Sequence, residues 1–167
     1  MGLMLDLLPA AGPALVVGGG EVAVRKVRVL REAGFDVTVI APIVRPELRS
    51  LPGVRILQRR VEEGDLEGHA VVFACTNDRS VNRAIGVWAR ARRIPVVVAD
   101  SAAESTALTP ALHRDGDLLV GVSTNGASPR LAQYIRDRIA AALGTGWAHR
   151  VEAARRERLR GRGDETA

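Results

Sequence analysis

The sequence predicts an α/β fold in which a parallel sheet carries helices on both faces and is followed by a small hairpin and helix. Three observations lead to this prediction. From Ala14 to Asp100, short apolar runs alternate with helical patterns across short connections. The first apolar run leads directly into three consecutive glycines. After Asp100 the alternation stops, and two strand-like runs flank an Asp-Gly pair that is typical of a hairpin.

The composition indicates a globular protein with an aliphatic core. Of its 167 residues, 47% are hydrophobic but only 3% are aromatic. No apolar stretch approaches the ~20 residues of a membrane span, and the apolar start lacks the positive leading region of a signal peptide. The single cysteine, Cys75, excludes an internal disulfide and fits a reducing, cytoplasmic compartment. The three histidines show no metal-ligand spacing, so no resident metal is expected.

The net charge of +5 restricts the class of partner. A basic chain can bind nucleic acid, but the interleaved aromatic residues that stack on bases are missing here, so no nucleic-acid partner is expected. A polyanionic small molecule suits this charge equally well.

The first strand, turn and helix are the most clearly marked elements. Residues 14–17 contain no polar side chain, as in a strand buried on both faces. Gly34 ends the helix that follows, in a capping position. The apolar face of that helix is predicted at Ala23, Val27, Leu30 and Ala33. Its surface positions are predicted at Arg25, Lys26, Arg28 and Arg31.

Four further strands are expected at residues 37–40, 54–57, 70–74 and 95–99. Between them we expect a short helix at 45–50, one helical turn at 62–66, and a longer helix with Val81, Ile85 and Trp88 on one face. Asn77, Asp78 or Ser80 is expected to cap the longer helix. Right-handed crossovers place the carboxyl ends of parallel strands along one crevice, so residues 18–21, 41–43, 75–78 and Asp100 should gather there.

The remaining segments follow weaker signals. Residues 101–106 resemble a loop, and residues 107–113 and 118–123 are expected to pair as a hairpin. Ser128 and Pro129 are predicted to begin a helix that ends at Gly144. Its apolar face is predicted at Leu131, Ile135, Ile139 and Ala142. The Arg-rich last twenty or so residues form either a helix in an assembly or a frayed tail, and residues 3–7 are expected to pack against the sheet edge.

The glycine turn is the strongest functional motif. Gly18, Gly19, Gly20 and Ala23 fit the pattern G-x-G-x-x-A, in which the first glycine permits a tight turn and the second lets a pyrophosphate approach the backbone. The position between a strand and a helix predicts a Rossmann-like dinucleotide site. A glycine-rich turn without a ligand is the alternative.

The second strand lacks the acid that usually binds the ribose. It is followed by Ala41, Pro42 and Ile43, while Asp36 precedes it and Glu47 lies well past it. Backbone groups could hold the ribose, or Arg45 could favour a 2′-phosphate. A solvated surface arginine is the more ordinary interpretation, so the choice between NAD and NADP stays open at this point.

Asp100 is the candidate catalytic residue. A carboxylate at the carboxyl end of a buried strand, beside a cofactor crevice, can act as a general base if burial raises its pKa. A cap for the loop that starts at Ser101 is an equally good interpretation of the position. Cys75, flanked by apolar residues, is expected to be an inert core thiol.

A second candidate group precedes the last predicted helix. Hydroxyls and amides of Ser123, Thr124 and Asn125 could bind carboxylates, and Arg130 could pair with an anion. Plain helix capping is the alternative, and it is preferred for Ser128. His113 is expected to be a surface residue of the hairpin.

Taken together, these motifs resemble the precorrin-2 dehydrogenase and sirohydrochlorin ferrochelatase family of siroheme biosynthesis, including the N-terminal module of siroheme synthases. The resemblance spans about residues 3–143. It rests on residues 16–23, 25–26, 32–34, 94–100 and 123–129, above all on the Gly-Gly-Gly-Glu-Val-Ala turn and the Ser-Pro helix start.

The resemblance implies NAD-dependent oxidation of precorrin-2 to sirohydrochlorin by a homodimer, with ferrous iron as a further substrate in some members. It implies that Glu21, Val22, Pro42, Ile43 and Thr76 contact the cofactor and that Asp100 is the essential acid. The chain departs from the family at Ser101-Ala102-Ala103, at the strand before Pro110, at Asn125 and in a largely missing C-terminal helical region, which bears on the chelatase activity more than on the oxidation.

The expected organisation is an NAD-binding Rossmann domain at 1–110, a dimerisation and substrate segment at 111–146 and an Arg-rich tail at 147–167. Two other functions are considered. A non-catalytic NAD-sensing domain would usually keep the ribose acid and would not explain the hairpin and Ser-Pro helix. A chelatase or tetrapyrrole-binding protein without dehydrogenase activity would not need the intact glycines.

Overall fold

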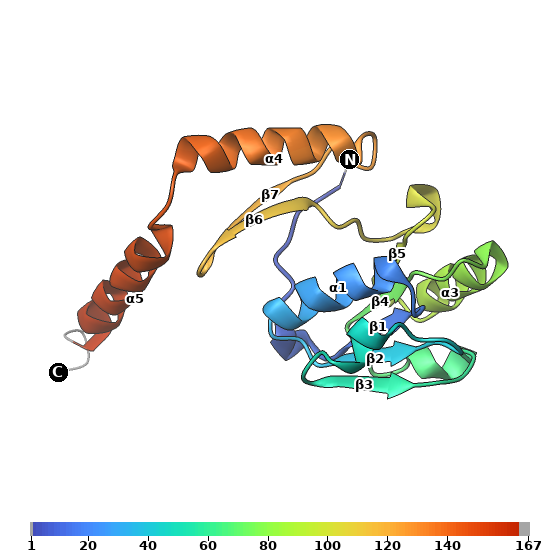
Figure 1. Cartoon of the computed structure of the whole chain (residues 1–167). Helices are drawn as coiled ribbons and strands as arrows, with labels where there is room; N and C mark the ends of the chain where they lie inside the picture. Colours follow the sequence, from blue (N-terminus) through green and yellow to red (C-terminus); the bar gives the residue numbers. More distant parts are fainter. Residues whose placement is uncertain (1, 164–167) are drawn as a thin grey trace. The chain divides into compact units, whose positions relative to one another are not determined.

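The computed structural model describes residues 2–163 and divides into two compact units. The first unit runs from Gly2 to Leu108, and the second begins at Thr109. Each unit has its own secondary structure, and each is described by itself below (Figure 1).

The first unit is built on a five-stranded parallel sheet. Its strands are β1 (Ala14–Val17), β2 (Val37–Ile40), β3 (Val54–Leu57), β4 (Val71–Ala74) and β5 (Val96–Val98). They are ordered β3-β2-β1-β4-β5, so the chain moves outward from β1 to β3 and then returns to β4 on the other side of β1. This reversal creates a topological switch point between β1 and β4, where α/β folds bind ligands. The predicted parallel sheet is confirmed, with β4 and β5 slightly shorter than expected.

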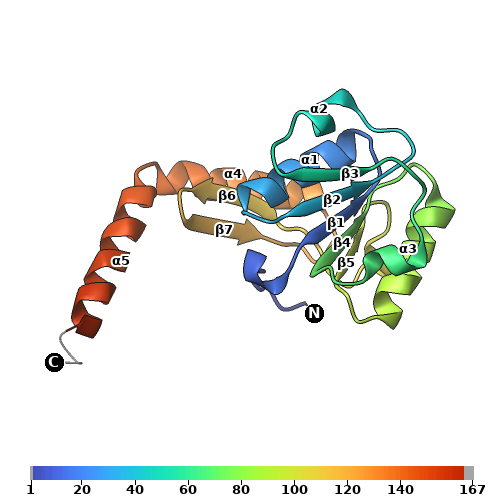
Figure 2. The same cartoon turned by 90° about the horizontal axis from the view of Figure 1, so that it is seen from below.

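Helices cover both faces of this sheet, as predicted (Figure 2). The faces separate because successive strand residues point to opposite sides. Val16 packs with α1 (Glu21–Glu32) and α2 (Pro46–Arg49) on one face, whereas Leu15 packs with α3 (Arg79–Ala91) on the other. The 3-10 turn Glu63–Leu66 adds Leu66 to the second face. Both layers are mainly aliphatic, in keeping with the composition, although Phe35 and Phe73 pack in the first and Trp88 against the second.

The helix ends follow the expected capping chemistry. Gly34 follows α1 with a φ of +87°, and Phe35 then donates a backbone hydrogen bond to Leu30. Of the three candidate caps for α3, Asp78 is the one used. Its carboxylate accepts hydrogen bonds from the amides of Ser80 and Val81.

Three expectations for the first unit are wrong. The opening residues do not pack on the sheet edge, since Leu3 and Leu5 are 83% and 78% exposed. Lys26 and Arg31 are half-buried rather than on the surface. The Lys26 Nζ lies 5.8 Å from the Phe73 ring centroid, and the Arg31 guanidinium donates to the Phe35 carbonyl at 2.6 Å. The segment after β5 contains a 3-10 turn, Ala102–Glu104, and is therefore more ordered than a plain loop.

The second unit contains a hairpin and two helices. Strands β6 (Ala111–Asp115) and β7 (Leu118–Val122) pair antiparallel, and the register leaves Gly116 and Asp117 as the turn. Gly116 has a φ of +59°, which two-residue hairpin turns require. The first strand begins later than predicted, because the amides of Thr106 and Ala107 both donate to the Val96 carbonyl and hold that segment against β5.

Helix α4 (Pro129–Leu143) begins as predicted, with the Ser128 hydroxyl accepting a hydrogen bond from the Leu131 amide. Its packed face differs from the prediction at Leu131, which is 49% exposed, and at Ala142, which is also exposed. The packed stripe centres on Ala132, which is buried, and on the half-buried Ile135 and Ile139. In a helix of about 3.6 residues per turn, Leu131 and Ala142 lie at one margin of the stripe formed by Ala132, Ile135 and Ile139.

The Arg-rich segment forms helix α5 (Trp147–Gly163), and residues 164–167 lie outside the described residues. Its first turn contacts the hairpin, because the Trp147 amide donates to the Asp115 carboxylate at 2.8 Å. Arg155 pairs with Asp117 at 2.6 Å. Within residues 2–163, no helix is long and apolar enough to cross a membrane.

Candidate functional site

The glycine turn connects β1 to α1 in a conformation that two of its residues can adopt only as glycine. Gly18 has a φ of +127°, and a Cβ there would collide with the Cys75 carbonyl of the neighbouring strand end. A Cβ on Gly19 would collide with the Ile43 carbonyl. The second collision was not anticipated from the sequence, since it comes from a loop that follows β2. The absence of side chains at Gly18 and Gly19 therefore lets the glycine turn lie close to Cys75 after β4 and to Ile43 after β2.

Gly20 is different, because a Cβ at this position would meet no atom within 4 Å. Gly20 is the N-cap of α1 and has an ordinary negative φ, so neither backbone strain nor packing requires glycine. The amides of the first helical turn, at Glu21 and Val22, begin here. An open backbone approach to a helix N-terminus fits the pyrophosphate of a dinucleotide. The residues present therefore fit the predicted cofactor.

The end of β2 presents an apolar side chain beside this turn. Ile43 is 83% exposed, and Pro42 is also exposed while its carbonyl accepts a hydrogen bond from Gln58. Arg45 is tied to the turn through its backbone, since its amide donates to the Gly19 carbonyl at 3.0 Å. Its guanidinium pairs with Glu47, with Nη2 at 2.7 Å and Nε at 3.2 Å from Oε1.

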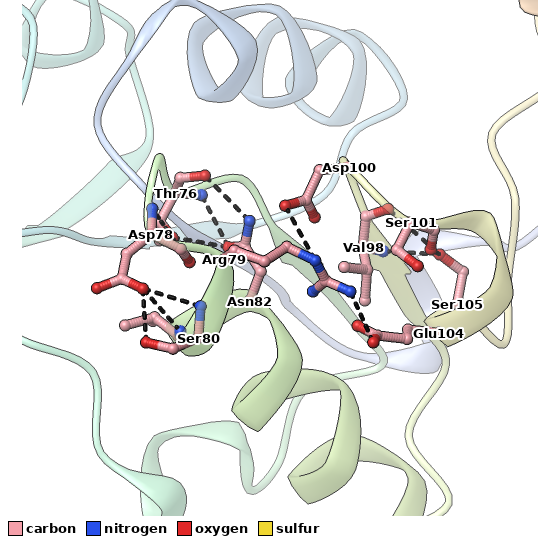
Figure 3. A network of polar contacts seen from close by, with 11 residues as sticks. Thr76, Asp78, Arg79, Ser80, Asn82, Val98, Asp100, Ser101, Glu104 and Ser105 are labelled. Carbon is pink, nitrogen blue, oxygen red and sulfur yellow. Dashed lines mark hydrogen bonds and ion pairs between the residues drawn. The ribbon is translucent and has the colours of Figure 1, made fainter.

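After the end of β4, the buried side-chain amide of Asn82 holds Thr76 in place (Figure 3). Asn82, on α3, has no exposed surface. Its Oδ1 accepts from the Thr76 amide at 3.0 Å and lies 2.7 Å from the Thr76 hydroxyl, while its Nδ2 donates to the Thr76 carbonyl at 3.0 Å. Sequence reasoning selected Thr76 but missed Asn82. The available signal was a polar residue one turn before Ile85 on the apolar face of the helix.

Asp100 lies at the carboxyl end of β5 and faces a positive charge (Figure 3). Its side chain is 40% exposed, so the burial on which the sequence argument for a general base depended is absent. The Arg79 Nε lies 3.7 Å from its Oδ2, and Arg79 Nη2 lies 2.6 Å from Glu104. The hydrogen bond from Arg79 lowers the pKa of Glu104. Two carboxylates thus share one guanidinium at this edge.

The loop after Asp100 is held by another residue. The Ser105 hydroxyl accepts a hydrogen bond from the Val98 amide and donates to the Ser101 carbonyl, each at 2.9 Å. Ser105 supplies these loop bonds, and the carboxylate of Asp100 lies near Arg79. Of the two interpretations of Asp100, loop capping loses its main support.

Cys75 lies beside Gly18 of the glycine turn and interacts electrostatically with Lys26 of α1. Cys75 is 6% exposed, and burial raises the pKa of its thiol to about 11. Burial also lowers the pKa of Lys26. A thiol with this pKa is protonated at neutral pH and is a poor nucleophile, as an inert core residue should be.

The other predicted residues belong to the second unit, in the turn before α4. The Ser123 hydroxyl accepts from the Asn125 amide at 3.1 Å, and Thr124 Oγ1 accepts from the Ser128 amide at 3.0 Å. Asn125 has a φ of +53°, a conformation that asparagine tolerates better than most residues. Arg130 is exposed, and His113 is half-buried rather than a surface residue. Within residues 2–163, no cluster of three metal-ligating side chains occurs.

Comparison with known proteins relates both parts of the chain to known families. Residues 7–111 match a family model described as "Putative NAD(P)-binding", and residues 115–142 match one described as "Sirohaem biosynthesis protein central". The chain is similar to a solved structure of SirC, precorrin-2 dehydrogenase, with a TM-score of 0.71 and 28% identity, covering 91% of this chain and 75% of that one. The Rossmann-like fold with its added hairpin and helix is thereby confirmed.

Curated relatives include longer proteins named siroheme synthase. The one from Ectopseudomonas mendocina is 44% identical over 128 residues, which make up 76% of this chain but 28% of that protein. The one from Methylococcus capsulatus is 42% identical over 153 residues, or 89% of this chain and 32% of that protein. The chain therefore spans about a third or less of the length of these relatives.

Proposed function

The chain belongs to the NAD(P)-binding family whose model covers residues 7–111, and from this premise we propose that it oxidises precorrin-2 to sirohydrochlorin with NAD, in siroheme biosynthesis. The observation that carries the proposal is the pairing of an open Gly20 with Asp100 on one edge of the sheet. The likeness to SirC over both units, and the match to the sirohaem central model, support the choice of substrate.

The first unit provides the seat for the cofactor. The α1 N-terminus and Gly20 would receive the pyrophosphate, and Ile43 would cover an apolar part of the dinucleotide. Thr76, held by Asn82, would border the cofactor at the end of β4. When bound, NAD supplies a ring that accepts a hydride from the substrate. The protein's part is to orient the two partners and to remove a proton.

Asp100 is the proposed proton acceptor. Oxidation of precorrin-2 transfers one hydride to NAD and releases one ring proton, so a base near the substrate is needed. The exposed carboxylate of Asp100 is accessible to a large substrate, and Arg79 holds it at the edge of the sheet. Arg79 would thereby act as a positioning residue.

The second unit would contribute to the substrate and to assembly. Precorrin-2 carries several carboxylates, and Ser123, Thr124, Asn125 and Arg130 are the proposed contacts.

We also propose a homodimer, because Leu131 and Tyr134 expose 49% and 61% of their surfaces on α4. Light scattering of the chain at micromolar concentration tests this, and a monomer would contradict it. We further propose a cytoplasmic location, in which the sole cysteine, Cys75, would stay reduced.

An anaerobic absorbance assay with precorrin-2 tests the main proposal. Conversion to sirohydrochlorin is expected with NAD in the wild type and is expected to fall by roughly 10²–10⁴-fold in Asp100→Ala. Asp36→Ala is the matched control, because Asp36 is an exposed acid before β2, at the opposite edge of the sheet. Binding of NAD without any turnover would favour a sensing domain instead.

Insertion of ferrous iron is a separate proposal. The exposed Asp100 carboxylate could also accept protons from pyrrole nitrogens as the metal enters, with iron as a substrate and not a resident cofactor. Adding ferrous or cobaltous ion to sirohydrochlorin under the same conditions tests this activity alone. A rate equal to that without protein would exclude it.

A further inference from the structure

We propose that the ion pair between Arg45 and Glu47 makes this site select NAD over NADP. The inference rests on the dinucleotide site of the proposed function and concerns only how the site responds to a 2′-phosphate. In dinucleotide folds the adenosine ribose is read just after the second strand, where an acid favours NAD and an arginine favours NADP. Here the strand ends without an acid, so the first charged side chain after it is Arg45.

The position of Arg45 is set by the glycine turn. Its amide donates to the Gly19 carbonyl at 3.0 Å, which fixes the main chain of residue 45 beside the turn that would hold the pyrophosphate. The side chain is half exposed, so a ligand can reach it. An arginine at this place would ordinarily provide a fork for a phosphate.

Glu47 occupies that fork. Two nitrogens of the guanidinium, Nη2 and Nε, lie 2.7 and 3.2 Å from the same carboxylate oxygen. The hydrogen bond raises the pKa of Arg45 and lowers that of Glu47, so both partners stay charged. A 2′-phosphate would have to displace this carboxylate, whereas the 2′-hydroxyl of NAD needs no such exchange.

The surrounding charges do not compensate. Glu21 acts on Arg45 and Arg28 acts on Glu47, so two positive and two negative side chains balance around the pair. A phosphate with nearly two negative charges gains no net attraction from such a balanced group. Removing Glu47 leaves two arginines against one acid and frees the fork. A single residue therefore separates the two cofactor preferences.

Calorimetric titration of the whole chain with NAD and with NADP tests the inference without any turnover. The wild type is expected to bind NAD at least tenfold more tightly than NADP. Glu47→Ala is expected to raise the affinity for NADP tenfold or more and to change that for NAD by less than about threefold. The double variant Arg45→Ala/Glu47→Ala should lose the gain, which shows that the freed guanidinium causes it.

Glu32→Ala is the matched control, because it removes an exposed acid at the far end of α1 and should leave the NADP affinity unchanged. An unchanged ratio of affinities in Glu47→Ala, or a wild type that prefers NADP, would overturn the inference while leaving the dinucleotide site intact. A wild type that binds neither dinucleotide would overturn the cofactor site and this inference together. Thermal unfolding of each variant verifies that the surface changes leave the fold intact.

Discussion

The guanidinium of Arg79 lies 3.7 Å from the carboxylate of Asp100, although the two residues come from different elements. Arg79 is the first residue of α3, and Asp100 follows β5. Asp78 caps α3 and thereby fixes the backbone position of Arg79 at the start of the helix. The Nη2 atom of Arg79 lies 2.6 Å from the Glu104 carboxylate. The candidate base Asp100 is thus held by the positive charge of Arg79, at the start of the helix that follows the neighbouring strand β4.

Replacing Arg79 should affect turnover more than cofactor binding. We expect Arg79→Gln to lower kcat for precorrin-2 roughly tenfold, because a displaced carboxylate accepts the proton less well, with the Kd for NAD unchanged. Arg79→Lys should recover part of the loss. Anaerobic kinetics and calorimetry measure the two quantities. A variant in which kcat is unchanged, or in which only KM rises, would show that Arg79 does not position Asp100.

Replacing Gly18 should mainly reduce stability, whereas replacing Gly20 should mainly reduce the affinity for NAD. Gly18→Ala is expected to lower the free energy of unfolding by roughly 2 kcal/mol or more, since φ is positive and the Cβ meets the Cys75 carbonyl. Gly20→Ala should change stability by less than about 1 kcal/mol but weaken NAD binding at least tenfold. Urea unfolding and calorimetry give both values. Equal NAD affinity in Gly20→Ala would place the pyrophosphate elsewhere.

Asn82 is expected to stabilise the fold through Thr76. Asn82→Ala removes three contacts and leaves the Thr76 amide without its acceptor, so the free energy of unfolding should fall by roughly 2–4 kcal/mol. Asn77→Ala, five residues earlier in the chain and exposed, should change it by less than about 0.5 kcal/mol. Urea unfolding compares the two variants. Similar small losses in both would mean that the buried amide contributes little.

Cys75 should make stability fall at alkaline pH. The folded thiol has a pKa of about 11, above its ordinary value of 9.0, so in this interval the unfolded chain loses a proton that the native state keeps. The contribution is complete below about pH 9 and is lost as pH rises through about 11, to a limit of roughly 2–3 kcal/mol.

Urea unfolding of the wild type and of Cys75→Ala, at about pH 8 and about pH 10.5, isolates this effect. The decrease in the wild type should exceed that in the variant, because only the wild type carries the Cys75 thiol. Equal decreases would show that burial does not raise the pKa of the Cys75 thiol in the folded protein.

Much of the fold follows from local patterns. The strands at 14–17, 37–40 and 54–57 have the predicted bounds, because apolar runs end at glycine, proline or charged residues that stop the pairing. The glycine motif also predicted a strand, a tight turn and a helix N-terminus correctly, since its spacing already specifies these three elements. Where a segment bonds to another part of the chain, as Thr106 and Ala107 do to the Val96 carbonyl, its bounds were predicted less well.

The sequence by itself determined the order of elements, the two-faced sheet and the place of the glycine turn, because these depend on periodicity and on backbone freedom. Tertiary structure alone decided which polar groups meet. Asn82 is hydrogen-bonded to Thr76, and Glu47 pairs with Arg45. Arg79 pairs with both Asp100 and Glu104. Such contacts depend on how loops and helix starts lie beside one another at the sheet edge, and charge or polarity at a single position does not specify its partner.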